Sequence, residues 1–204
     1  MTQGASIVHA FVTQWTTKPG HLNTLASAYK AQLLPQLEVA PGCRHAFVVA
    51  AERSNTLFTV SLWDSERERD ANPGSPHHSK EAKLGRHLTN NPNQEPFEVL
   101  VRAGISSNGL FARLITLPVQ ADNIDAALTV YKEEYLPLLQ AQPGFLQVIW
   151  LANRDSGTGW GMSFWSAREQ MLAADQEGEF FPKVLARLAV YFHDKPEMHY
   201  YNVI

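Results

Sequence analysis

The chain has 204 residues, of which 45% are hydrophobic and 18% charged, and its formal net charge is −3. This is the composition of a folded globular protein, and the lack of Lys/Arg clusters argues against a nucleic-acid or membrane-surface partner. Met1 to Ser6 contain no basic segment ahead of a long apolar run, so we expect neither a signal peptide nor a membrane span. The single cysteine, Cys43, excludes an intrachain disulfide and favours a reducing cytoplasm.

The sequence contains one pattern twice, with the second copy 102 positions after the first. Each copy has a Leu-Pro pair, a Pro-Gly pair and a Ser-x-Trp motif in the same register: Leu34-Pro35, Pro41-Gly42 and Ser61-x-Trp63, then Leu136-Pro137, Pro143-Gly144 and Ser163-x-Trp165. A shared register along the whole chain is typical of an internal duplication. We therefore predict two domains, residues 1–102 and 103–204, joined by a flexible link at 104–109.

The first elements of each copy are a strand and a helix. Residues 7–15 are rich in β-branched and aromatic side chains and precede a Pro-Gly turn, which predicts a strand. Apolar residues at spacings of three and four then predict a helix over 22–33. Residues 110–117 and 124–135 repeat both patterns. Because proline disfavours helix continuation, we expect both helices to end near the Leu-Pro pair.

Two strands, a second helix and a last strand complete each copy. The middle strands are predicted over 46–52 and 57–63, and over 148–152 and 160–165, each pair joined by a polar tip. A polar helix start with a capping residue follows each Trp, and the last strands are predicted over 97–101 and 199–203. The order β-α-β-β-α-β gives an α+β fold class with two ferredoxin-like units. Because each sheet leaves one face bare, we predict that the two sheets face each other within the chain.

The third strand of each copy predicts a hollow between the sheet and its helices. Every second residue of this strand points to the same face, and that face has two small residues and one large aromatic residue. They are Thr59, Ser61 and Trp63 in the first copy, and Gly161, Ser163 and Trp165 in the second. A hollow lined by small residues and bounded by a Trp suits a flat, mostly apolar ligand.

With this repeat, this element order and the string Trp63-Asp-Ser65 followed by Ser75-Pro76-His77-His78, both halves resemble the antibiotic biosynthesis monooxygenase family of the dimeric α+β barrel superfamily. The resemblance implies two ferredoxin-like units forming an intramolecular dimeric α+β barrel, with a pocket between sheet and helices in each unit. It also implies cofactor-independent oxygenation of phenolic or polycyclic aromatic compounds to quinones. Other members of the superfamily degrade haem, and many have no known activity.

The chain departs from the family at several positions. In members that oxidise polyketide phenols, the resemblance implies an Asn four residues before the Trp. This chain has Thr59 and Gly161 at that position. Haem-degrading members have a His ten residues after the Trp, where this chain has Pro73 and Asp175, so haem degradation is not supported. Asn72 stands where many relatives of unknown function have a His.

Two histidines after Trp63 are predicted to carry the chemistry. An oxygenase without metal or flavin needs one group that accepts a proton and others that hold the substrate anion. Imidazole titrates near neutral pH, so we predict His77 and His78 as catalytic residues together with Trp63. The alternatives are that both histidines are exposed loop residues and that Trp63 serves packing alone.

The predicted substrate-binding residues are those expected around the hollow: Asn72, Thr59, Ser61, Tyr29, Trp165 and Arg113. Arg113 and His9 lie on first strands, where each could face the hollow or the space between the sheets. A buried Arg113 needs a carboxylate partner or a bound anion. The histidines do not have the spacing of metal ligands, so no metal and no other cofactor is predicted.

We interpret the chain as a cofactor-independent monooxygenase that oxidises a small aromatic, quinol-like compound. The alternative is a ligand-binding or stress-response module of the same fold without turnover. The predicted partner is a small aromatic molecule, and a homodimer of the two-unit chain remains open. We expect the first copy to hold the working site, because bulky side chains should fill the hollow of the second: Phe181, Val184, Leu185 and Leu188.

Overall fold

The structure, a computed structural model, describes residues 8–51, 54–71, 82–105, 109–176 and 180–204. The chain forms two compact units, Met1–Val99 with Ile204 and Leu100–Val203. Both have the predicted β-α-β-β-α-β order, with each helical part divided into short segments. No helix within the described ranges is both long and apolar enough to cross a membrane.

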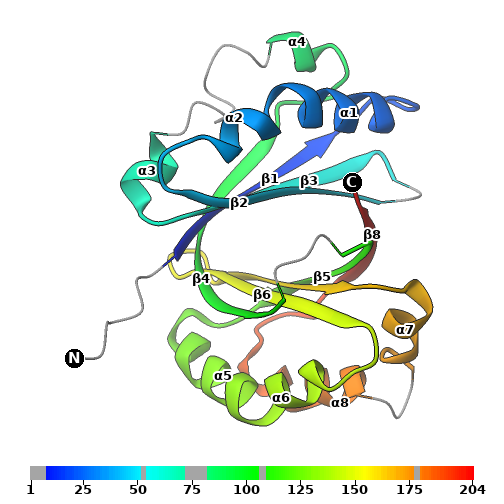
Figure 1. Cartoon of the computed structure of the whole chain (residues 1–204). Coiled ribbons are helices and arrows are strands. Elements are labelled where there is room, and N and C mark those ends of the chain that lie inside the picture. The colour runs from blue at the N-terminus through cyan, green and yellow to red at the C-terminus, as the bar shows by residue number, and fades with distance from the viewer. Residues whose placement is uncertain (1–7, 52–53, 72–81, 106–108, 177–179) are drawn as a thin grey trace. The chain divides into compact units, whose positions relative to one another are not determined.

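The first unit is an antiparallel sheet in the order β4-β1-β3-β2, with α1 and α2 along one face (Figure 1). Its helix-side core contains Trp15, Tyr29 and Trp63, whose side chains are almost completely buried. The elements are β1 Val8–Thr16, α1 Leu22–Gln32, α2 Leu34–Glu38, β2 Cys43–Ala50, β3 Thr56–Trp63, α3 Glu66–Asp70, α4 Ala82–Gly85 and β4 Asn93–Gly104.

The second unit repeats this arrangement in the order β8-β5-β7-β6, with α5, α6 and α8 along one face of its sheet (Figure 1). The elements are β5 Phe111–Pro118, the 3-10 turn η1 Ala121–Asn123, α5 Ile124–Val130, the π-helical turn η2 Tyr131–Tyr135, α6 Leu136–Gln140, β6 Phe145–Asn153, β7 Thr158–Trp165, α7 Arg168–Ala173, α8 Phe180–Leu188, the 3-10 turn η3 Ala189–Tyr191 and β8 Met198–Val203.

The prediction that the first helix of each copy ends near its Leu-Pro pair is confirmed in the first unit, where α1 ends at Gln32, and was wrong in the second. In the second unit the helix passes through η2 and continues as α6, and in the first a new short helix, α2, begins at Leu34. Pro35 and Pro137 occupy the first positions of these short helices. A proline is tolerated there because its missing N–H would have had no partner within the helix.

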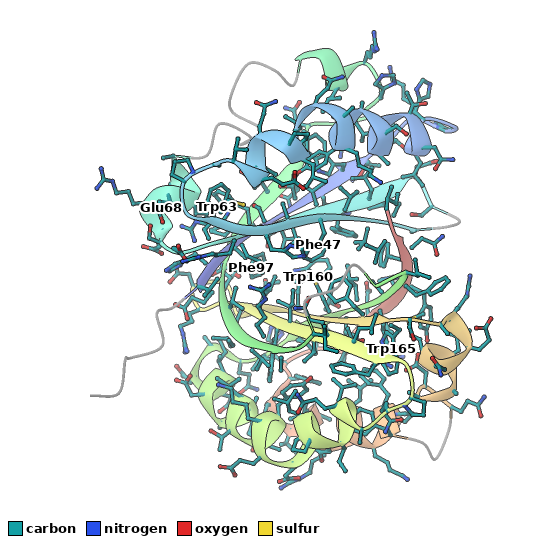
Figure 2. All side chains as sticks on the ribbon, viewed as in Figure 1. Phe47, Trp63, Glu68, Phe97, Trp160 and Trp165 are labelled. Carbon is teal, nitrogen blue, oxygen red and sulfur yellow. The ribbon has the colours of Figure 1, made fainter. Side chains whose placement is uncertain are left out.

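The helices that follow the two tryptophans differ in their caps. In the first unit the Ser65 side chain accepts a hydrogen bond from the Glu68 N–H at 3.2 Å and donates one to the Glu68 carboxylate at 2.8 Å. This is a capping box, and Glu68 lies near Trp63 (Figure 2). In the second unit Ala167 stands at the equivalent position and gives no side-chain cap. The predicted capping residue is therefore confirmed only in the first unit.

The first unit includes the last residue of the chain, and the second unit begins within β4. Ile204 belongs to the first unit, where its N–H donates to the Val48 carbonyl at 3.0 Å. The end of β4 belongs to the second unit, where the Ile105 N–H donates to the Leu146 carbonyl at 2.8 Å. Gly104 has φ +101°, and its backbone packs so closely on Leu146 that a Cβ would overlap the Leu146 carbonyl oxygen. Position 104 therefore requires glycine.

The antiparallel sheet and the helices of each unit confirm the predicted α+β fold class with two ferredoxin-like units.

Candidate active site

A pocket opens between the sheet and the helices of the second unit. It contains about 530 Å³ of empty space, counting the part open to solvent. The small residues Gly161 and Ser163 of β7 line it, as the predicted hollow requires. The rest of the lining is mainly apolar and aromatic: Ile115, Leu117, Tyr131, Leu139, Val148, Trp150, Met162, Phe180, Phe181, Val184, Leu185 and Leu188, with Arg113 as the charged residue.

The expectation that bulky side chains fill this hollow was wrong. Phe181 and Val184 are buried at 7% and 3% exposure, but with Leu185 and Leu188 they form a wall of the pocket. The reason is that these side chains lie along α8, at the helix side, while Gly161 carries no side chain to meet them from the sheet. A Cβ added at Gly161 would meet only the Leu117 side chain, at an ordinary contact distance of 3.4 Å.

Arg113 of β5 is buried in this pocket at 1% exposure. Its Nη1 pairs with the Asp175 carboxylate, whose second oxygen accepts a hydrogen bond from the Tyr200 hydroxyl at 2.8 Å. The guanidinium lies over the Phe181 ring at 3.8 Å and within 5.4 Å of the Trp165 ring centre. The carboxylate partner that a buried Arg113 requires is therefore Asp175, and aromatic faces add cation–π contacts.

Burial and pairing act against each other on the pKa values of this cluster. Burial raises the pKa of the Asp175 carboxyl, while Arg113 and the Tyr200 hydroxyl act to lower it. Burial, with the hydrogen bond to Asp175, raises the pKa of Tyr200 to about 12. Tyr200 is therefore a neutral hydrogen-bond donor at physiological pH, and Arg113 keeps its charge because a guanidinium hardly loses its proton in proteins.

Two buried N–H donors of the pocket lining have no partner among the described residues: Arg113 Nε and Trp150 Nε1. A buried donor without an acceptor costs free energy. Trp150 packs edge-on against Tyr131, with ring centres 4.8 Å apart, and burial raises the pKa of Tyr131 well above its usual value. The lining thus combines an apolar wall with two buried N–H donors that no described group satisfies.

The equivalent space of the first unit contains a tryptophan. Trp15 of β1, at 1% exposure, donates from its indole N–H to Thr59 Oγ1 at 3.0 Å and packs edge-on against Tyr29. Trp63 donates from its own indole N–H to Ser61 Oγ at 2.9 Å. The predicted residues Thr59, Ser61, Tyr29 and Trp63 are therefore brought together, with Trp15 among them. The second unit has Leu117 in place of Trp15 and keeps only the Trp165-to-Ser163 bond, at 3.0 Å.

The remaining predicted site residues divide between the two units. His77, His78 and Asn72 lie outside the described residues. Trp165, at the α7 end of its sheet (Figure 2), and Arg113 lie close to each other in the second unit. His9 has its Nδ1 3.8 Å from a Glu66 carboxylate oxygen. Among the described residues, no three His, Cys, Asp or Glu side chains are grouped as a metal site would require.

Sequence reasoning did not single out Trp150, Tyr200 or the role of Asp175. The repeat gave no signal for them, because the first copy has Val48, Glu98 and Pro73 at these positions. The usable signal was Arg113 itself: a basic residue in an apolar strand predicts a buried acidic partner.

Comparison with known proteins agrees with this fold. Residues 9–83, in the first unit, match the sequence model of the antibiotic biosynthesis monooxygenase family. This segment belongs to that family. The resemblance derived from the sequence is thereby confirmed, and the second unit, which lies outside the match, has the same element order as the family segment. No curated protein sequence matches the chain.

Solved structures share the fold over nearly the whole chain at low sequence identity. A protein of Fusobacterium nucleatum assigned as a monooxygenase is 14% identical with a TM-score of 0.77, and the match covers 98% of this chain and 94% of that chain. An anthrone oxidase-like protein is 13% identical with a TM-score of 0.69, covering 100% and 94%. The heme-degrading enzyme of Listeria monocytogenes is 10% identical with a TM-score of 0.53, covering 95% and 98%. At such identities the likeness concerns the fold alone.

Proposed function

We propose that the chain is a cofactor-independent monooxygenase that oxidises a small, flat aromatic compound in the pocket of the second unit. The observation that carries this proposal is the pocket itself, with an almost wholly apolar lining and the donors Arg113 Nε and Trp150 Nε1. The family of residues 9–83 supports a monooxygenase-type reaction. The single cysteine favours the cytoplasm as its compartment.

In such a reaction the electrons come from the substrate. The aromatic compound binds in its neutral form and, once it has lost a proton, its enolate or phenolate passes electrons to O₂, so that one CH₂ group and one O₂ become one C=O group and one H₂O. The apolar wall excludes water from the bound ring, and the two N–H donors would stabilise negative charge that develops on a substrate oxygen. Arg113 and Trp150 are therefore our candidates for anion stabilisation.

A binding module without turnover is the second candidate, and one observation favours it. The described pocket lining contains Arg113 and Tyr131 as its titratable side chains, and the pKa of Tyr131 is raised by burial. Neither accepts a proton readily at neutral pH. On this alternative the pocket captures an aromatic ligand and leaves it unchanged.

Oxygen uptake separates the two candidates. The full chain is mixed with a panel of hydroquinones and anthrones in metal-free buffer, and O₂ consumption is followed together with ligand affinity. Uptake above the spontaneous rate supports the monooxygenase. Saturable binding without uptake across the panel refutes it in favour of the binding module.

Two matched variants test which unit carries the site. Gly161→Leu introduces a side chain into the pocket at a position where a Cβ meets only the Leu117 side chain, so we expect the fold to be kept and ligand affinity to fall at least tenfold. His77→Ala tests the first-unit site predicted from the sequence. Loss of affinity in His77→Ala with full affinity in Gly161→Leu would move the site to the first unit and overturn our assignment.

A further inference from the structure

We infer that the second-unit pocket selects neutral ligands that carry carbonyl oxygens and rejects organic anions of the same shape, because Asp175 already balances the charge of Arg113. The inference rests on the proposed pocket as the ligand site and deepens it by naming the charge class of the ligand. Its specificity-determining residues are Arg113, Trp150 and Asp175.

The charge balance follows from burial and pairing. Arg113 and Asp175 have side chains only 2% and 7% exposed, and they are paired directly. The second carboxylate oxygen of Asp175 is occupied by the Tyr200 hydroxyl, a neutral donor. The cluster therefore has no net charge to offer an incoming anion. An anionic ligand would lose its hydration in an apolar pocket without a free countercharge, which is costly.

The hydrogen-bonding capacity of the pocket points to acceptors. Arg113 Nε and Trp150 Nε1 are buried donors that no described group satisfies. A carbonyl oxygen accepts hydrogen bonds without bringing a charge, so it satisfies a donor at the lowest desolvation cost. Arg113 lies on β5 and Trp150 on β6, and β7 pairs with both strands. The two donors therefore come from different strands, and a ring with two carbonyl oxygens has one acceptor for each.

Three compounds with one ring frame test this selectivity by equilibrium dialysis against the full chain. Durene has no oxygen, duroquinone has two neutral carbonyl oxygens, and 2,3,5,6-tetramethylbenzoate has an anionic group. The four methyl groups of duroquinone block addition of Cys43 to the ring. We expect duroquinone to bind about fivefold or more tighter than durene, and tetramethylbenzoate to bind at least about tenfold more weakly than duroquinone.

Asp175→Asn reverses the selectivity if the reasoning holds. The amide keeps the shape of the carboxylate but leaves the charge of Arg113 unbalanced, so we expect the affinity for tetramethylbenzoate to rise about tenfold or more, with little change for duroquinone. The matched control is Asp125→Asn, which makes the same charge change in an exposed pair with Arg154 and leaves all three affinities within about twofold. Trp150→Phe keeps an aromatic ring and removes one donor, so the preference for duroquinone over durene should fall.

Several outcomes overturn the inference. One is a wild-type protein that binds tetramethylbenzoate most tightly, and another is equal affinity for durene and duroquinone. A folded Asp175→Asn protein that still rejects the anion overturns the role of Asp175, with folding checked by circular dichroism. If Asp175→Asn fails to fold, the wild-type ranking and Trp150→Phe decide. Since duroquinone binding involves no turnover, absent oxygen uptake from anthrones would refute the proposed activity and leave this inference standing.

Discussion

Two Arg–Asp pairs in the second unit should differ several-fold in what they contribute to stability. Arg113 and Asp175 are 2% and 7% exposed, while Arg154 and Asp125 are 40% and 75% exposed. Asp175→Ala leaves a buried guanidinium without its carboxylate and removes the acceptor of the Tyr200 hydroxyl. Breaking a buried pair by removing one partner costs about 3–5 kcal/mol. Asp125→Ala breaks a solvent-screened pair, which is worth about 0.2–1 kcal/mol.

The assay is urea unfolding of the wild type and both variants at pH 7, followed by tryptophan fluorescence and circular dichroism. Coincident transitions from the two probes allow the unfolding free energies to be compared. We expect Asp175→Ala to lose at least about 2 kcal/mol more than Asp125→Ala. A difference below about 1 kcal/mol would refute the view that the buried pair is held without water, because only screened pairs have such small effects.

Two further predictions concern local stability and pH. Ser65→Ala removes the capping box of α3 and should lower the unfolding free energy by about 1 kcal/mol. Ala167→Ser adds a cap at the equivalent position before α7 and should raise the unfolding free energy by up to about 1 kcal/mol. Equal urea midpoints for the wild type and both variants would contradict this prediction. Burial and the nearby Arg86, His21 and Lys18 lower the pKa of His87, so the unfolded chain binds a proton there at higher pH than the folded chain, and stability falls as pH drops below about 6.5. The melting temperature should therefore fall less between pH 7.5 and pH 5.5 in His87→Gln than in the wild type, and an identical fall would remove His87 from the explanation.

The sequence carried most of the fold because the fold depends on periodic features. The 102-residue register, the two Pro-Gly turns and the alternation in β3 and β7 are each visible without coordinates. The helix endings at Pro35 and Pro137 could not be decided in this way, because a proline that ends one helix can equally begin the next. A proline that ends a helix and a proline that begins one give the same sequence pattern.

The site was harder to predict because the two copies use different strands for the same purpose. A tryptophan packs edge-on against a tyrosine in both units, but it is Trp15 of β1 in the first and Trp150 of β6 in the second. At the repeat offset these positions hold Leu117 and Val48. The space between sheet and helices in each unit therefore depends on where each large ring lies in three dimensions, and the repeat alone does not determine it. The pairing of Arg113 with Asp175 also joins positions far apart in the sequence.

We expect the π-helical turn at Tyr131–Tyr135 to make the helix side of the pocket easier to deform than the sheet side. The first copy has the same number of residues in this region, where α1 ends at Gln32 and α2 begins at Leu34, so the wide turn does not come from an inserted residue. A π turn is rare in helices, so we expect a ligand that contacts Tyr131 to shift this turn more readily than it shifts a regular helix. The opposite wall, formed by β5, β6 and β7, is fixed by its strand ladders. Ligands of different thickness should therefore be accommodated by movement of the helix, with the sheet as the fixed reference surface.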